Sequence, residues 1–181
     1  RVYFVLNRHL NPTNVCVLSC GFCDFAKKKG DDGAYEMTMD EMLSYMDPEI
    51  REVHIVGGHH PDWPFEKYLE IVATIHEHFP DAQIKAFTAA EIDYFYRRWK
   101  ITPEESLKRL KEAGLQSMPG GGAEVFSDRV HKLLFPGKAN GDRWLEIHRI
   151  AHEMGIPTNA TILYGHIEDY EERIDHMIRL R

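Results

Sequence analysis

Three cysteines, the only ones in the chain, stand close together as Cys16, Cys20 and Cys23. An odd number of closely spaced cysteines fits a disulfide framework badly and a shared set of metal ligands well. A structural zinc ion usually takes four protein ligands from paired Cys-x-x-Cys knuckles, whereas three thiolates from one tight loop can bind three irons of a cubane and leave the fourth iron open. With the aromatic Phe22 and Phe25 beside the last cysteine, the spacing favours a 4Fe-4S cluster over zinc.

Glycine-rich segments after predicted strands are the next candidates for ligand binding. Gly57 and Gly58 follow one strand, where missing side chains let the backbone approach a ligand closely, although such a pair alone is more often a simple turn. The glycines at 120–122 follow a later strand and could turn backbone N–H groups toward a ligand, with Glu124 as a candidate partner for ribose hydroxyls. The alternative for this second segment is a flexible loop with an exposed glutamate.

Histidines supply a third set of candidates. The chain has 11 of them, and a given histidine is usually structural. His59 and His60 follow the glycine pair and His166 ends the last predicted strand, so we expect these three to line the site. A structural role is expected for His54, His76, His148 and His176.

These residues depend on elements that bring strand ends together. Short β-type runs are predicted at 2–6, 53–56, 84–87, 115–118 and 159–164. Amphipathic helices are predicted from Thr38, over 64–79, from Thr102 to a stop at Gly114, around Trp144 to a stop at Gly155, and over 170–180. Such alternation indicates a parallel sheet, whose carboxyl-end face would gather the candidate residues. The expected fold class is α/β, a partial (β/α) TIM-type barrel of about five βα units.

Composition and charge exclude several classes of function. Of 181 residues, 43% are apolar and 28% are charged, which is typical of a globular domain. The net charge is −7 and no basic stretch is longer than Lys27 to Lys29, so we expect no nucleic-acid partner. No apolar run approaches the roughly 18 residues that cross a bilayer, and no signal-peptide cleavage region follows the first residues. We therefore expect no membrane partner and a cytoplasmic location.

Blocks of sequence in colinear order over essentially the whole chain resemble the aminofutalosine synthase family of the radical S-adenosylmethionine (SAM) superfamily, which serves the futalosine route to menaquinone. The blocks are 11–25, 56–64, 85–91, 119–124 and 160–168. Dehypoxanthine futalosine cyclases share the cysteine loop and the Gly-Gly-Gly-Ala-Glu block, so these two elements do not separate the families. The runs His60-Pro-Asp-Trp63 and Ala86-Phe-Thr-Ala89 favour the synthase.

The resemblance implies two cofactors, a 4Fe-4S cluster and S-adenosyl-L-methionine, whose amino and carboxylate groups would occupy the open iron. It implies that the glycine pair receives the methionine amino group, next to His59, which stands where the superfamily often has an acidic residue. The segment after the fifth strand would contact adenine, with Thr161 where that block usually has glycine. The cofactor-binding residues implied in this way are Gly57, Gly58, His59, Glu124, Thr161, Leu163 and Gly165, with Cys16, Cys20 and Cys23 on the cluster.

The activity implied by the resemblance is that of a radical SAM transferase, which adds the 5′-deoxyadenosyl radical to the enolpyruvyl double bond of 3-[(1-carboxyvinyl)oxy]benzoate and forms 6-amino-6-deoxyfutalosine. A one-electron donor such as flavodoxin or ferredoxin would reduce the cluster. His166 and His60 are the candidate catalytic residues, and Arg8, His9 and His60 are candidates for binding the substrate's carboxylates. Two alternatives stay open: a cyclase, in which the radical abstracts hydrogen, and a non-catalytic iron-sulfur electron-transfer module, which would normally bring a fourth cysteine.

Residues 1–181 are expected to form one radical SAM core domain that is a fragment of a longer protein. About five βα units do not close a (β/α)₈ barrel, which usually needs about 250 residues. The sequence also starts within a predicted strand and stops within a predicted helix. An N-terminal lead-in and C-terminal barrel units would be absent, and the first and fifth strands should then have unpaired, exposed backbone.

Overall fold

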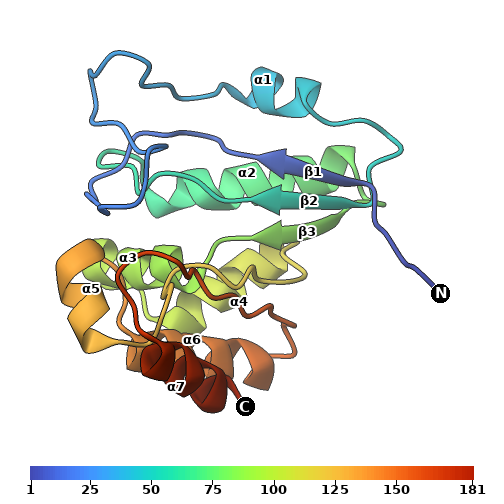
Figure 1. Cartoon of the computed structure of the whole chain (residues 1–181). Helices are drawn as coiled ribbons and strands as arrows, with labels where there is room; N and C mark the ends of the chain where they lie inside the picture. The colour runs from blue at the N-terminus through green and yellow to red at the C-terminus, as the bar shows by residue number, and fades with distance from the viewer.

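The computed structural model describes residues 1–181 and has a parallel sheet at its centre. Its strands are β1 (Asn7–Leu10), β2 (Glu52–Ile55) and β3 (Gln83–Ala86), in the order β1-β2-β3. Asn7 pairs with Glu52, which pairs with Gln83, and all three strands point the same way in Figure 1. Two single parallel bridges, from Lys85 to Ser117 and from Met118 to Thr158, continue the sheet beyond β3. This order confirms the predicted α/β class and the partial barrel.

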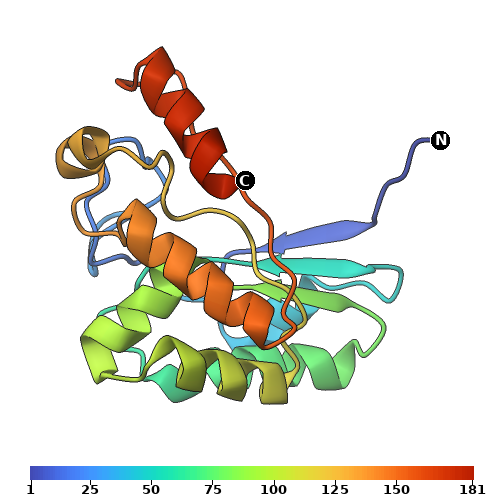
Figure 2. The same cartoon turned by 90° about the horizontal axis from the view of Figure 1, so that it is seen from below.

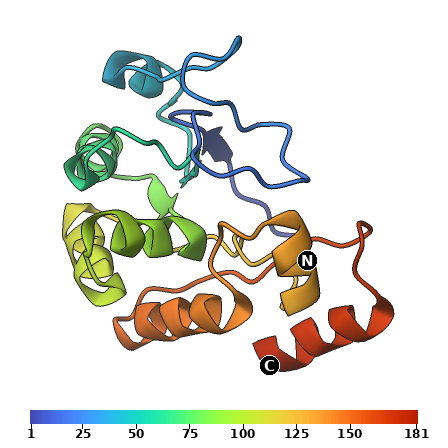
Figure 3. The ribbon, with the colours of Figure 1, turned by 90° about the vertical axis from the view of Figure 1, so that its left-hand side faces the viewer.

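Seven helices surround the strands. They are α1 (Met39–Ser44), α2 (Phe65–His78), α3 (Ala89–Trp99), α4 (Pro103–Ala113), α5 (Asp128–Leu134), α6 (Gly141–Glu153) and α7 (Tyr170–Leu180). Viewed toward the carboxyl ends of the strands, they form an arc from α1 through α2, α3 and α4 to α6 and α7 (Figure 3). Figure 2 shows α2 and α4 on one side of the sheet and α7 on the other. None of the helices combines the length and apolar composition needed to cross a bilayer.

The core lies between the sheet and the helices on its outer face. Val53, Ile55 and Ile84 are completely buried in a cluster of 31 residues that also includes Ile71 of α2 and Leu107 of α4. Because side chains alternate along a strand, the intervening positions point to the opposite, inner face. Packing of this outer face against the helices therefore holds the strands in place, and the residues that follow their carboxyl ends are available to form a site.

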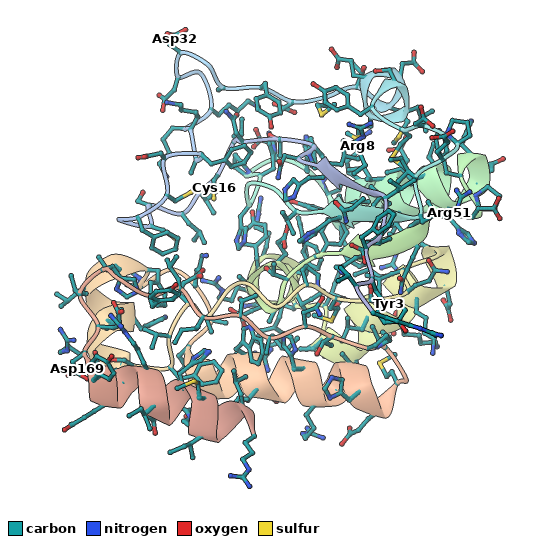
Figure 4. All side chains as sticks on the ribbon, turned by 45° about the vertical axis from the view of Figure 1, so that its right-hand side comes forward. Tyr3, Arg8, Cys16, Asp32, Arg51 and Asp169 are labelled. Carbon is teal, nitrogen blue, oxygen red and sulfur yellow. The ribbon has the colours of Figure 1, made fainter.

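The predicted strand at 2–6 is wrong, because the strand begins at Asn7. Val2, Tyr3 and Phe4 are at least 82% exposed, and Leu6 is the first residue whose carbonyl accepts hydrogen bonds from the β2 side, from Arg51 and Glu52. Figure 4 shows Tyr3 on a segment that extends past the end of the sheet. A β-type composition does not make a strand without a neighbour to pair with.

The fourth and fifth predicted strands are reduced to the two single bridges. Ser117 and Met118 form them within the predicted run 115–118, but 159–164 has no strand geometry. The fifth segment stays beside the fourth through two backbone hydrogen bonds, from Asn159 to Met118 and from Leu163 to Glu124. Pro119 lacks an N–H and the next three residues are glycine, so regular pairing cannot continue there.

Most of the predicted helix starts and stops agree with the structure. Thr38 and Glu41 form a complete capping box, whereas Thr102 only accepts from Glu105 N and the reciprocal bond is missing. Gly114 ends α4 with φ 118°, as a left-handed stop requires. Two helices were not predicted: α3, where Glu91 reaches back to Thr88 N, and α5.

Replacing the N-cap of α4, Thr102→Ala, should destabilise the full-length protein by about 1 kcal/mol, because Glu105 N would lose its acceptor. Urea unfolding followed by circular dichroism measures the change. The control is Lys108→Ala at an exposed position of the same helix, which should leave stability within about 0.5 kcal/mol. An equal effect of the two substitutions would contradict a capping role.

Candidate active site

A pocket of about 230 Å³ opens at the carboxyl ends of the strands. Except for Lys138, every segment that lines it follows a strand or a sheet bridge, as expected for a barrel-type site. The lining side chains come from the cysteine loop after β1, the run Val56 to His59 after β2, the start of α3, the glycine segment after Met118, and Lys138 between α5 and α6. Cys16 marks the first of these in Figure 4, in the loop beyond β1.

All three cysteines line this pocket as free thiols. Cys16 is buried, and its Sγ accepts hydrogen bonds from the backbone N–H of Leu18 at 3.4 Å and of His59 at 3.3 Å. Cys20 and Cys23 are half-buried and joined by a turn in which Cys23 N donates to Cys20 O. Burial raises the pKa of the Cys20 thiol, against the opposing effect of the nearby Lys138 ammonium.

The cysteine loop is fixed from two sides. Lys28 donates through Nζ to the carbonyls of Cys16, Val17 and Leu18, at 3.1, 3.2 and 2.7 Å. On the other side, Gly21 N donates to Leu134 O at the end of α5. Nothing in the local sequence around Lys27 to Lys29 shows that one ammonium folds back onto carbonyls ten to twelve residues away.

The donor set fits an iron-sulfur cubane. No three histidine, cysteine, aspartate or glutamate side chains come close enough to hold a single metal ion. In a cubane each thiolate binds a different iron, so the sulfurs border one space without meeting at a point. Cys16, Cys20 and Cys23 border one pocket in this way.

The glycine pair after β2 lies directly against the cysteine loop. A Cβ atom on Gly58 would be 2.1 Å from Val15 O, and one on Gly57 would be 2.9 Å from Thr13 O. Gly58 N donates to Thr13 O, and Val17 N donates to His59 O. The close approach of two backbones therefore requires glycine here, and it sets the position of the first cysteine relative to β2.

His59 lines the pocket as a neutral imidazole. Burial lowers its pKa to about 3, helped by the positive charges of Lys138 and Arg97. Its ring packs against Tyr94 with centroids 4.9 Å apart, and its buried Nδ1 has no hydrogen-bond partner. An imidazole in this state can donate or accept a hydrogen bond but supplies no charge.

Glu91, at the start of α3, is a pocket residue that sequence reasoning did not single out. It is 3% exposed, and its carboxylate accepts from Thr88 N at 2.6 Å and from Gly57 N at 3.2 Å. Burial raises the pKa of this carboxyl to about 7, although both hydrogen bonds act to lower it. The only sequence signal for Glu91 was its spacing from Thr88, which indicates a helix cap and not a pocket residue.

Glu124 and Lys138 form an ion pair in the pocket wall, with Nζ 2.5 Å from Oε1. Burial alone would lower the pKa of Lys138, but the Glu124 carboxylate and the thiols of Cys20 and Cys23 raise it above its ordinary value. Glu124 has φ 57°, a left-handed conformation that costs energy for a residue other than glycine. Trp144 Nε1 donates to Gly121 O and holds the glycine segment in place. The sequence analysis did not identify Lys138, which is the one lysine or arginine in the pocket lining.

His60 does not line the pocket. It is 1% exposed, and its Nδ1 accepts from the backbone N–H groups of Asp62 and Trp63, both at 3.1 Å. This places the proton on Nε2, which lies 3.1 Å from Glu36 Oε1. Nδ1 thus serves the turn after the glycine pair, and Nε2 faces Glu36 in the segment before α1, so the ring is turned away from the pocket.

The predicted adenine segment lies next to the glycine segment but outside the pocket lining. Thr161 Oγ1 donates to Gly120 O, and Leu163 N donates to Glu124 O. Gly165 has φ 88°, and its N–H donates to Glu168. His166 is engaged locally: its Nδ1 accepts from Ile167 N and its Nε2 lies 3.0 Å from Leu163 O.

Residues 10–180 match the family model described as the Radical SAM superfamily. The chain is 49% identical to an aminodeoxyfutalosine synthase from Thermus thermophilus, over 100% of this chain and 50% of the relative. It is 44% identical to a 5-amino-6-(D-ribitylamino)uracil–L-tyrosine 4-hydroxyphenyl transferase from Methanopyrus kandleri, over 99% of this chain and 50% of that protein. The chain thus spans about half the length of these curated relatives.

A solved structure with the same arrangement is that of methylornithine synthase (PylB). It covers 97% of this chain and 50% of its own chain, with a TM-score of 0.78 and 18% sequence identity. At this identity the likeness shows the fold alone. It supports the partial barrel derived from strand order and bridges.

Proposed function

Because this chain belongs to the radical SAM superfamily, whose enzymes use a 4Fe-4S cluster and S-adenosylmethionine, we propose that it is the radical SAM core of an aminodeoxyfutalosine synthase. The reaction transfers the 5′-deoxyadenosyl group of S-adenosylmethionine to 3-[(1-carboxyvinyl)oxy]benzoate and releases methionine. Rearrangement with loss of the carboxyl carbon of the enolpyruvyl group then gives 6-amino-6-deoxyfutalosine for menaquinone biosynthesis. The pocket bordered by three free thiols and by the glycine pair after β2 supports the superfamily's chemistry. The observation that carries the choice of the synthase is the 49% identity to the Thermus thermophilus relative. The identity to the Thermus thermophilus relative confirms the family resemblance read from the sequence blocks.

The cluster and the cofactor have separate places in this proposal. Cys16, Cys20 and Cys23 would hold three irons, and a cluster bound there would supply the electron that cleaves the cofactor's sulfonium. Glu124 is suited to ribose hydroxyls, because a carboxylate accepts hydrogen bonds from both. Lys138 is suited to a carboxylate, since it is the one lysine or arginine in the lining.

The pocket wall helps to exclude water and stray hydrogen donors. The lining has apolar side chains beside the thiols, among them Leu18, Phe25 and Val56. A dry, enclosed cavity protects a reactive group and holds it near its target. A flavodoxin or ferredoxin would be the electron donor, and free thiols suit the reducing cytoplasm in which we place the reaction.

A second candidate reaction is favoured by one observation, the 44% identity to the Methanopyrus kandleri transferase. That enzyme's name describes transfer of a 4-hydroxyphenyl group from tyrosine to 5-amino-6-(D-ribitylamino)uracil. The cysteine loop and pocket suit any enzyme of the superfamily, so the substrate that the protein turns over has to decide between the two reactions.

Incubating the reconstituted full-length protein with adenosyl-labelled S-adenosylmethionine and the enolpyruvyl benzoate should place the label in a covalent adduct that carries adenine. The reason is that addition to an alkene makes the cofactor a true substrate. Mass spectrometry of the products measures how much label the adduct contains. Parallel incubations with tyrosine plus 5-amino-6-(D-ribitylamino)uracil, and with dehypoxanthine futalosine, serve as controls.

Turnover only in the tyrosine incubation would replace the proposal by the second candidate. Turnover only with dehypoxanthine futalosine, accompanied by free 5′-deoxyadenosine, would replace it by the cyclase. Labelled adduct in the first incubation alone supports the synthase.

A further inference from the structure

A row of polar side chains crosses the inner face of the sheet, opposite the face that the helices cover. Four residues, paired in register across neighbouring segments, form it: His9, His54, Lys85 and Ser117. Residues in register share a face, and the next residue along β2 and along β3, Ile55 and Ala86, is buried in the outer core. We call these four residues the inner row. It contains one lysine and no acidic residue.

The inner row lies beneath the pocket that the cysteines border. Asn11 and Val56, which line that pocket, come two residues after His9 and His54 along the chain. A strand rises about 3.3 Å per residue, so the row is about 7 Å below this part of the pocket lining. The interior of a barrel is usually filled by bulky branched side chains. A polar row at this depth therefore indicates a polar ligand that reaches down from the pocket.

Several polar groups of the inner row have no partner within the protein. Ser117 is 5% exposed and its Oγ makes no hydrogen bond, and the buried Nε2 of His54 makes none either. Lys85 Nζ lies 2.6 Å from Glu52 Oε2, which occupies one of the three N–H donors of the ammonium. Buried polar groups without partners are costly and uncommon, so these groups point to a ligand.

The groups of the inner row that lack a partner suit an anion. An ammonium, an imidazole and a hydroxyl can all donate hydrogen bonds, and a carboxylate accepts several of them on its two oxygens. Burial lowers the pKa of the His54 imidazole, and His9 and Lys85 act in the same direction, so the surroundings of this ring disfavour a further positive charge. Glu52, the nearby carboxylate, is already held by Lys85 and by Asn7 Nδ2 at 2.5 Å.

We propose that the inner row binds the ring carboxylate of the substrate, with Lys85 as its charged partner and with Ser117 and His54 as hydrogen-bond donors. The inference rests on the proposed function and names the contact within the same site. The reacting alkene has to lie beside the cofactor at the strand ends, and the ring carboxylate is at the opposite end of the rigid aromatic substrate. Arg8, an earlier candidate for the substrate's carboxylates, pairs with Val53 on the outer face and cannot take this role.

The test compares two ligands on the reconstituted full-length protein with S-adenosylmethionine but without reductant, so that no turnover occurs. Equilibrium binding is measured for the enolpyruvyl benzoate and for 2-phenoxyacrylate, which lacks only the ring carboxylate. Lys85→Met should weaken the benzoate about tenfold to a hundredfold, as expected for losing a charged hydrogen bond, and should change 2-phenoxyacrylate less than about threefold. Lys85→Arg keeps the charge and should retain part of the preference for the benzoate.

Ser117→Ala is the second variant, because it removes a buried hydroxyl without a partner and should leave the urea midpoint unchanged or higher. It should weaken the benzoate about tenfold and leave 2-phenoxyacrylate nearly unchanged. The matched control is Lys67→Met, which removes another lysine paired with a glutamate, Glu70, but on α2 outside the sheet. It should change neither affinity by more than about twofold.

Equal weakening of both ligands by Lys85→Met and by Ser117→Ala would overturn the inference, because it would show a general effect on the fold. Unchanged affinities in both variants, or equal binding of the two ligands by the unaltered protein, would overturn it as well. In these three cases the proposed function stands. If the unaltered protein binds neither ligand, the proposed function fails and the inference fails with it.

Discussion

Replacing Cys16, Cys20 or Cys23 singly by serine should remove the iron-sulfur absorbance near ~400 nm and abolish turnover. In the proposed site each thiolate would bind a different iron, so the loss of any one would leave the cubane with two protein ligands. All three side chains border the same pocket, and each is assigned to its own iron, so neither of the remaining two cysteines can replace the third. Iron content and visible absorbance after anaerobic reconstitution of the full-length protein measure the result.

The matched control is Ser19→Ala, an exposed residue of the same loop that does not line the pocket. It should keep full iron content and show that the loop tolerates substitution. A cysteine variant with unaltered iron content would contradict the assignment of that thiolate. Reconstitution of the unaltered protein with zinc and without iron would contradict the cluster altogether.

The meeting of the three cysteines at one pocket could be predicted from the sequence because the information is local. Three cysteines in one short segment must meet wherever the segment folds, so their spacing alone indicates one site. The glycine pair could be placed for a related reason: Gly57 and Gly58 follow a strand whose apolar pattern is clear, and a parallel sheet brings that end to the cysteine loop. The central strands and five of the helices had equally strong local signals.

Residues that tertiary contacts bring to the pocket could not be predicted in this way. Lys138 lies between two helices, one of them unpredicted, and it reaches Glu124 from the other end of α5, which no local signal shows. Glu91 has the spacing of a helix cap, and nothing local shows that its other oxygen faces Gly57. His60 shows the opposite error, because sequence proximity to the glycine pair does not reveal that its ring turns away toward Trp63 and Glu36.

Gly58→Ala should prevent the cysteine loop from closing on β2 and thereby lower cluster content far below that of the unaltered protein. The new Cβ atom would be 2.1 Å from Val15 O and 2.6 Å from Val15 C, so backbone rather than a flexible side chain must move. Val15 directly precedes Cys16, and His59 N donates to the Cys16 sulfur. Displacing either backbone should therefore move the sulfur of Cys16 away from its place in the pocket. Overpacking of this kind also costs about 1–3 kcal/mol in stability.

The comparison variant is Gly121→Ala, where the new Cβ atom meets nothing nearer than Thr88 Cγ2, at an ordinary 3.5 Å. Both glycines line the pocket, so the two variants differ mainly in the closeness of the neighbouring backbone. Iron per polypeptide after identical reconstitution, together with the urea midpoint of the full-length protein, separates them: Gly121→Ala should stay near the unaltered values and Gly58→Ala should fall on both measures. Full iron content in Gly58→Ala would show that the 57–59 segment and the cysteine loop can move apart without loss of the site, and the coupling between β2 and the cluster ligands would then have to be abandoned.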